Sequence, residues 1–375
     1  MTREVVITGI GLVSCAGEGV EAHLEAMSSG APPRADAETY APYPVHPVVP
    51  VDFDRQIPKK SDQRQMEAWQ RLGTYAAGMA LDSAAAKDDT DLKARMHLIV
   101  AAGGGERDYA ADSAILSGLR TAPDPGVFLN QHLMSDLRPT LFLAQLSNLL
   151  AGNISIVHGV TGASRTFMGE ESSGTDAIRI AQARIASGQD DIFLVGGSYN
   201  AERPDALLVH AMGGFLWKHP YRPVFDRGPE GGLVLASGGA FLVLEAREHA
   251  EERGVRPLAK VAGVVSDRSR REPGSVKRMI ATLGARLEAH PDLVISGATG
   301  VAPITAEEQD ALRELAPRAR LHATGDVTGH LLEAQASAGV GLAAAMIARG
   351  EAGEALVTAM GHRRGEGMIR VTRVS

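Results

Sequence analysis

The chain has 375 residues, enough for two domains or one large double domain with a sizeable core. Hydrophobic residues make up 44% and charged residues 22%, and the single cysteine excludes both a disulfide framework and a cysteine-rich zinc site. The 45 acidic residues outnumber the 38 basic ones and give a net charge of −7, which argues against a general nucleic-acid binder.

The N-terminal stretch offers a short apolar run that glycines interrupt, which is shorter than a signal peptide requires. No window reaches the roughly 18 consecutive apolar residues of a membrane span. We therefore expect a cytoplasmic protein with no membrane span.

Strands and helices alternate through the first part of the chain. The β-branched run at 5–11 predicts a buried strand that ends in a tight glycine turn. Residues 18–30 favour a helix that Gly30 ends, and the Pro-rich stretch 31–60 favours a surface excursion. Apolar spacing then predicts further helices and strands: helices at 65–86, 140–152 and 247–254, and strands at 97–108, 191–200 and 238–246, the strand at 97–108 running into a glycine turn.

After Pro257 the alternation begins again. It predicts strands at 258–266, 292–300, 354–362 and 367–375, and helices at 275–290, 307–316 and 331–350. Strands that alternate with helices indicate a layered α/β fold whose sheets are covered on both faces. The two series suggest an N-terminal half at 1–247 and a C-terminal half at 258–375.

Five stretches, in chain order, resemble parts of the β-ketoacyl-acyl-carrier-protein synthase family. They are the first strand and loop, an early loop and helix, the nucleophile elbow, the strand pair that closes the first half, and the Lys/His segment: 5–19, 57–69, 165–202, 222–245 and 323–340. The resemblance implies a five-layered α/β/α/β/α thiolase-like fold made of two similar halves. It extends to chain-length-factor-like proteins and to divergent synthases of very-long-chain lipid A acyl groups.

The family's mechanism implies what the site should contain. A cysteine thiolate at a helix N-terminus takes an acyl group from a carrier protein, because the helix end lowers the pKa of the thiol. Two histidines then help to decarboxylate malonyl-carrier, and the carbanion attacks the thioester. The resemblance implies no cofactor, because acyl chains arrive on the phosphopantetheine of the carrier protein.

The catalytic positions depart from the family pattern. Glu171 stands at the nucleophile position, and 295–303, where the family has its first histidine, contains none. Gly325 stands at the lysine position and is non-functional there, whereas His330 retains the second histidine. A glycine-rich turn with a gating phenylalanine is replaced by GHRRGEG at 361–367. Cys15 lies in the first loop, and we interpret it as a small buried residue.

Three roles remain open for Glu171. It could be a carboxylate that fixes the pocket and hydrogen-bonds to His330, a residual decarboxylase, or a residue that caps the free N–H groups of its helix. His330 could equally be a satisfied core histidine. Ser172 and Ser173 have no partner base nearby in sequence, which argues against a serine nucleophile.

The remaining charged residues suggest a docking surface but no metal site. The resemblance predicts that Lys59, Lys60 and Arg64 form a basic surface for an acidic carrier protein, although they could also belong to an ordinary solvated loop. No metal-ligand spacing is evident, including among Asp62, Glu67, His132 and His210.

Three functions follow as alternatives. The chain could be a catalytically deficient, chain-length-factor-like subunit that pairs with an active ketosynthase. It could be a malonyl-carrier decarboxylase or thioester hydrolase that uses Glu171 and His330, or a non-catalytic module that binds acyl carrier protein. The family implies a dimer formed through the first half, either a heterodimer or a homodimer, with the apolar strand at 191–200 as an interface element.

Overall fold

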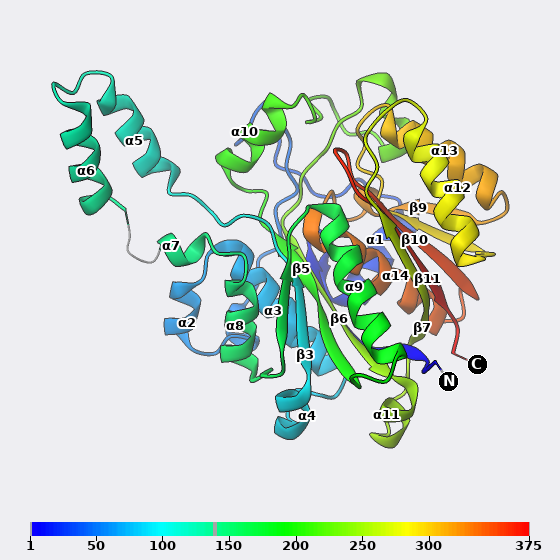
Figure 1. Ribbon diagram of the computed structural model, residues 1–375. Coiled ribbons are helices and arrows are strands. Elements are labelled where there is room, and N and C mark those ends of the chain that lie inside the picture. The colour runs from blue at the N-terminus through cyan, green and yellow to red at the C-terminus, as the bar shows by residue number, and fades with distance from the viewer. Residues whose placement is uncertain (1, 138–140, 375) are drawn as a thin grey trace.

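The structure is a computed structural model that describes residues 2–137 and 141–374. Its strands form one hydrogen-bonded series in the order β4-β3-β5-β6-β1-β7-β11-β10-β8-β9, and the short β2 pairs with β1 (Figure 1). The bounds of the strands are β1 (Val5–Ser14), β2 (Gly17–Glu18), β3 (His97–Ala101), β4 (Ser164–Phe167), β5 (Ile192–Tyr199), β6 (Gly238–Ala246), β7 (Ala259–Asp267), β8 (Leu293–Ser296), β9 (Arg320–Ala323), β10 (Glu354–Met360) and β11 (Glu366–Thr372).

The α-helices lie between these strands in the sequence, and short 3-10 helices form several of the turns. The α-helices are α1 (Gly19–Ser29), α2 (Lys60–Gln65), α3 (Ala68–Ser83), α4 (Thr90–Arg95), α5 (Tyr109–Leu119), α6 (Pro125–Ser135), α7 (Leu141–Ala144), α8 (Leu149–His158), α9 (Glu171–Ala186), α10 (Pro204–Met212), α11 (Arg247–Glu252), α12 (Ser275–Leu287), α13 (Ile304–Leu315) and α14 (Gln335–Ala348). The 3-10 helices are η1 (Phe53–Arg55), η2 (Val224–Asp226), η3 (Gly228–Glu230), η4 (Thr324–Asp326) and η5 (Leu332–Ala334).

The two halves of the strand series have the same topology. In the first half β4, β3 and β5 are parallel, and β6 and β1 follow antiparallel. In the second half β9, β8 and β10 are parallel, and β11 and β7 follow antiparallel. The halves meet where β1 pairs with β7 at only two positions, Val6 and Ile7.

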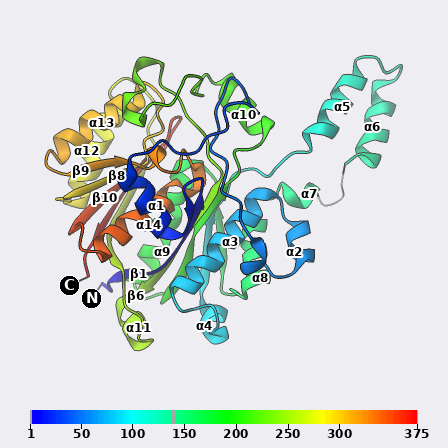
Figure 2. The same cartoon turned by 180° about the vertical axis from the view of Figure 1, so that it is seen from behind.

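Five layers result, as the resemblance predicts. The helices α9 and α14 each pack against strands of both halves and so form the central layer (Figures 1 and 2). The outer face of the first half is covered by α3 and α8, and that of the second half by α12, which packs on α13. Nearly all of α14 is buried, which explains its small residues: Ala and Gly let it fit between two sheets.

The first strand is longer than the sequence predicts. The expected tight turn after residue 11 is wrong, because β1 continues through Gly9 and Gly11 to Ser14. A Cβ atom at Gly11 would lie 1.9 Å from the carbonyl oxygen of Ala76, and one at Gly9 would lie 2.3 Å from that of Ala80. These glycines therefore serve the close approach of α3 to the strand rather than a turn.

Two further expectations need correction. The helix predicted at 140–152 is two helices, α7 and α8, separated at 145–148, and residue 140 lies outside the described residues. Ser147 and Asn148 occupy the break, in keeping with the preference of such residues for helix ends. The strand predicted as an interface element, β5, lies inside the sheet between β3 and β6, whereas β4 forms the sheet edge.

A helical hairpin not predicted from the sequence projects from the body. The helices α5 and α6 pack on each other and extend away from the sheet in both views (Figures 1 and 2). They expose Leu116, Val127, Leu133 and Met134, which are unusual on a surface in contact only with water. Within the described ranges, no helix is long and apolar enough to cross a membrane.

The close contact between β1 and α3 gives a test of the fold. We expect Gly11→Ala to lower the free energy of unfolding by about 1–3 kcal/mol, because its methyl group overlaps backbone that must move. Urea denaturation measures the change. The matched control is Gly104→Ala, whose methyl group would meet nothing within 4 Å and should change stability by less than about 0.5 kcal/mol. Equal stabilities of the two variants would contradict the packing described.

Candidate functional site at the N-terminus of helix α9

A sharp turn connects the edge strand β4 to α9. Glu170 adopts φ 53° and ψ −133°, a positive-φ conformation that costs energy for a non-glycine residue. The turn delivers Glu171 as the first residue of α9, in the middle of the molecule. The nucleophile position implied by the resemblance is therefore at the N-terminus of a central helix.

The carboxylate of Glu171 is fully buried between two histidines. Its Oε1 accepts a hydrogen bond from Nε2 of His330 at 2.8 Å and another from Nδ1 of His362 at 3.0 Å. The predicted hydrogen bond between Glu171 and His330 is confirmed. The contact with His362 was missed, and the absence of a histidine at 295–303 therefore does not leave the site with one imidazole.

These contacts decide the charge of Glu171. Burial favours the neutral acid, but the N–H groups of His330 and His362 outweigh it and hold the pKa of Glu171 well below its usual range. The N-terminus of α9 also favours a negative charge. Glu171 is therefore a carboxylate at neutral pH.

His362 reaches the site from the turn between β10 and β11. Arg271 fixes this turn by donating to the carbonyl oxygens of Gly361 at 2.6 and 2.9 Å and of Gly365 at 2.9 Å. A Cβ at Gly361 would lie 3.1 Å from Oε2 of Glu171, so the turn lies directly against the carboxylate. The sequence contained one indication of this contact. His362 stands between Gly361 and Gly365, in the stretch that replaces the gating turn of the family.

His330 is held by its own backbone. Its N–H donates to the carbonyl of Val234 at 2.9 Å, and its carbonyl accepts from the N–H of Ala236 at 3.0 Å. Two ring nitrogens of the site, Nδ1 of His330 and Nε2 of His362, have no hydrogen-bond partner among the described residues. The ring of His210 lies 5.4 Å from that of His362, and burial lowers the pKa of His210 to about 3, so it is neutral.

The other singled-out residues make different contacts. Gly325 is in η4, where a Cβ would lie 2.7 Å from Val224, so a lysine would not fit without movement. Cys15 is 6% exposed, which confirms it as a small buried residue, and burial raises the pKa of its thiol to about 12. The hydroxyls of Ser172 and Ser173 donate to the carbonyls of Gly169 and Glu170 at the helix start.

A cavity of about 480 Å³ opens beside the elbow. We call it the arginine cavity, because Arg268, Arg270, Arg363 and Arg364 line it together with Gly169, Glu170, Ser172 and Ser269. Two of these arginines lie near a carboxylate. Arg363 lies 3.8 Å from Glu170, and Arg268 lies 3.4 Å from Asp176. The cavity is therefore a basic hollow beside the elbow.

The predicted docking residues lie elsewhere. Lys59 immediately precedes α2, and Lys60 and Arg64 belong to it, on the flank near α3 and α8 (Figures 1 and 2). All three are exposed, and Lys60 forms an ion pair with Asp54. Their role in docking stays a prediction.

One group of side chains has a spacing compatible with a metal ion. Ligand atoms of Glu170, Glu171 and His362 all lie within 4.8 Å of one another, a grouping that the sequence did not reveal. Oε1 of Glu171 is already shared by two N–H donors, and Arg363 faces Glu170. We therefore interpret the group as a hydrogen-bonded cluster.

Comparisons with known proteins agree with this architecture. The family described as "Beta-ketoacyl synthase, N-terminal domain" matches residues 2–250. The chain is 25% identical over 270 residues to 3-oxoacyl-[acyl-carrier-protein] synthase 2 of Vibrio cholerae, covering 70% of this chain and 62% of that protein. It is 26% identical over 332 residues to the tetracenomycin polyketide synthase ketoacyl synthase beta subunit of Streptomyces glaucescens, covering 83% of this chain and 77% of that subunit.

Solved structures show the same fold over the full chain. The ishigamide ketosynthase/chain length factor superposes with a TM-score of 0.83 at 20% identity, and a β-ketoacyl synthase from Burkholderia phymatum with 0.82 at 19%. Each comparison covers 100% of both chains.

The chain belongs to the β-ketoacyl synthase family. It has the thiolase-like fold of that family. The matched region spans less than two thirds of the length of the Vibrio cholerae relative.

The buried carboxylate should be visible in the pH dependence of stability. We expect Glu171→Gln to lower the free energy of unfolding at pH 7 by about 2 kcal/mol, the order of a hydrogen bond to a charged group. The pKa of Glu171 is depressed in the folded state, so its contribution is present above the unfolded value of about 4.3 and is lost as pH falls through the lower folded value. Urea denaturation between pH 3 and 7 measures the difference.

The control for this experiment is Glu252→Gln, an exposed substitution at the end of α11. It should leave stability unchanged at every pH. A difference between the wild type and Glu171→Gln that stays constant from pH 7 to pH 3 would show that the charge of Glu171 contributes nothing.

Proposed function

We propose that this chain is a β-ketoacyl synthase-like subunit of fatty-acid or polyketide synthesis that does not condense acyl chains by itself. It pairs with an active ketosynthase and shapes the acyl tunnel, as a chain-length-factor-like subunit. The observation that carries the proposal is the ionised, fully buried Glu171, whose carboxylate is bonded to both imidazoles of the site.

The carboxylate is unsuited to acyl transfer. Condensation in this family needs a thioester, and a carboxylate nucleophile would form a mixed anhydride that hydrolyses readily. Glu171 is also held in place by two charge-assisted hydrogen bonds, which lower its nucleophilicity. The thiol of Cys15 offers no substitute, because it is buried with a raised pKa.

The two histidines are engaged as well. Decarboxylation of a malonyl thioester needs N–H donors at the oxygen where negative charge develops. Here the ring nitrogens that face the elbow, Nε2 of His330 and Nδ1 of His362, both donate to Glu171. A decarboxylase would have to free one of them, so this geometry favours a locked site over a malonyl-carrier decarboxylase or a hydrolase.

Pairing with a second subunit has support on the surface. The projecting hairpin of α5 and α6 exposes apolar side chains, and β4 leaves a sheet edge open. Relatives of similar sequence include a ketoacyl synthase beta subunit, and the fold matches that of a ketosynthase/chain length factor. A homodimer through the same surfaces is the alternative assembly.

The acyl carrier protein is the expected second partner. The arginine cavity next to the elbow carries four guanidinium groups, which suit the phosphodiester of a phosphopantetheine arm or the acidic surface around it. Lys59, Lys60 and Arg64 offer a second basic surface farther along the molecule. No resident cofactor is part of the proposal.

Product analysis tests the lack of chemistry directly. We expect the purified chain, mixed with acyl-loaded and malonyl-loaded carrier protein, to form no covalent adduct by intact mass and to release no carbon dioxide from malonyl-carrier. An active ketosynthase is the positive control. Loss of malonyl that disappears in both Glu171→Ala and His330→Ala would instead establish the decarboxylase.

The pairing is tested in the same preparation. The chain should co-purify with an active ketosynthase when the two are expressed together, and the pair should survive size-exclusion chromatography. Carrier binding without any such pair would point to the non-catalytic binding module and would overturn the proposed assembly.

The two basic surfaces make different predictions for carrier docking. We expect Arg363→Glu combined with Arg364→Glu to weaken acyl-carrier binding at least about tenfold, because two attractive charges in the arginine cavity become repulsive. Lys59→Glu combined with Lys60→Glu is the matched change on α2 and should have a smaller effect. Surface plasmon resonance measures both, and a larger loss in the second variant would assign docking to the α2 surface.

A further inference from the structure

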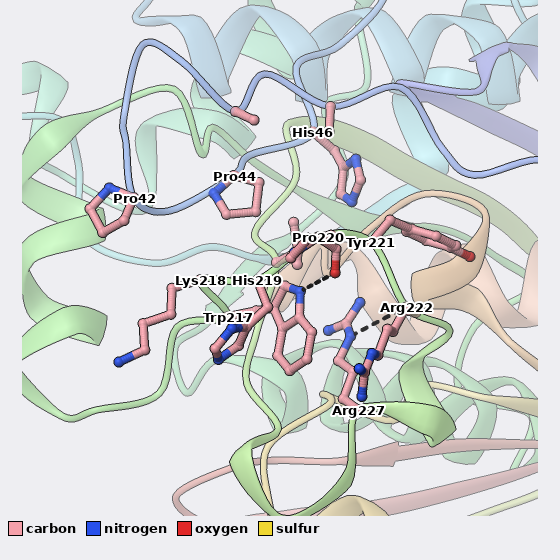
Figure 3. A pocket seen from close by; sticks show the side chains of 13 residues that line it. Pro42, Pro44, His46, Trp217, Lys218, His219, Pro220, Tyr221, Arg222 and Arg227 are labelled. Atoms are coloured by element: carbon pink, nitrogen blue, oxygen red, sulfur yellow. Dashed lines mark hydrogen bonds between the residues drawn. The ribbon is translucent and has the colours of Figure 1, made fainter.

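A second cavity lies away from the elbow and shares only Val234, whose carbonyl accepts from the N–H of His330, with the site described above. It has a volume of about 330 Å³ and lies between the segment 35–46 and the segment 217–227 (Figure 3). We call it the Trp217 pocket. Its volume is within the range of small-molecule sites, so it has room for one small ring system.

The walls of this pocket are apolar and flat. Pro42, Pro44 and Pro220 line it together with Trp217, which is only 3% exposed and has the Arg227 guanidinium over its ring at 5.7 Å (Figure 3). The indole of Trp217 is fixed because its Nε1 donates to the carbonyl of Pro220 at 3.1 Å. Proline rings beside the rim of an indole suit a planar apolar group.

The charges that line the pocket have one sign. Lys218, Arg222 and Arg227 line it, and no aspartate or glutamate does. Arg227 is only 4% exposed, yet no carboxylate among the described residues lies within 4.0 Å of it. Asp326 is close enough to act on its charge but accepts a hydrogen bond from the backbone of Val224.

The Arg227 guanidinium is only partly satisfied. Its Nε donates to the carbonyl of Arg222 at 3.3 Å and its Nη1 to that of Gly232 at 2.7 Å. Burial lowers its pKa to about 10, which still leaves it charged at neutral pH. A buried charge normally has a counter-charge, so the position calls for an anion.

The opposite side of the pocket offers a hydrogen-bond acceptor. His46 is buried, and its ring points into the pocket toward the side occupied by Arg227 (Figure 3). Its Nδ1 lies 2.7 Å from the carbonyl of Arg34, which can only accept, so the ring proton is on Nδ1. Because burial lowers the pKa of His46 to about 4, the ring is neutral and its Nε2 is a bare acceptor.

We propose that the Trp217 pocket binds a hydroxylated aromatic carboxylate. The carboxylate bonds to Arg227, the ring lies against Trp217 and the prolines, and the hydroxyl donates to Nε2 of His46. Binding at this site does not depend on the proposed pairing with a ketosynthase.

Three small molecules test which groups of the ligand the pocket recognises. We expect 4-hydroxybenzoate to bind the full chain more tightly than benzoate, and benzoate more tightly than phenol, by isothermal titration calorimetry. Trp217 should report binding by fluorescence, since the chain has only one other tryptophan, Trp69. Failure of 4-hydroxybenzoate to bind at millimolar concentration, or equal binding of all three probes, would overturn the proposal.

Substitutions of Arg227 and His46 test the proposed contacts with the carboxylate and the hydroxyl of the ligand. Arg227→Met should weaken both carboxylates about tenfold, the effect of losing one hydrogen bond to a charged group. His46→Phe should weaken 4-hydroxybenzoate about fivefold, the effect of one neutral hydrogen bond, and leave benzoate unchanged. Equal losses for the two ligands in His46→Phe would contradict the hydroxyl contact.

A variant at the rim avoids any risk of unfolding from the loss of Arg227. Ala37 is exposed and lines the pocket, so Ala37→Trp should block it and abolish binding while leaving stability unchanged. Ala31→Trp, on the same exposed segment but outside the pocket, is the matched control and should bind normally. Binding that survives Ala37→Trp would place the ligand elsewhere.

Discussion

A carboxylate can remain charged in a protein interior only when N–H donors replace the water it has lost. Glu171 satisfies this condition through His330 and His362, and the surrounding structure serves to hold these three side chains together. The strained backbone of Glu170 delivers the carboxylate, and Arg271 fixes the turn that carries His362. The site therefore depends on electrostatic satisfaction of one buried charge.

The duplicated topology explains why residues so distant in sequence meet. Glu171 begins α9, which follows the edge strand β4, and His330 lies between the edge strand β9 and α14, the equivalent helix of the second half. His362 follows β10, and His210 lies after β5, the equivalent strand. Because α9 and α14 share the central layer, corresponding positions of the two halves converge at one point.

Sequence patterns could predict many of the strands and helices and two of the three side chains that meet at the site. The family resemblance singles out Glu171 and His330, and the structure brings the two side chains into contact. His362 could not be placed, since it is 191 residues from Glu171 and depends on the conformation of a hairpin turn. Gly11 was misjudged for a related reason: only the packed α3 reveals that glycine is needed for close approach.

The backbone segment that holds His330 also forms part of the Trp217 pocket. Val234 lines that pocket while its carbonyl accepts the N–H of His330, and the adjacent Leu235 carbonyl accepts the N–H of His46. A ligand that shifted His46 or Val234 would therefore act on the position of His330 through two short backbone contacts. His330 also donates to Glu171, so the pocket and the elbow share one backbone segment although they share no side chain.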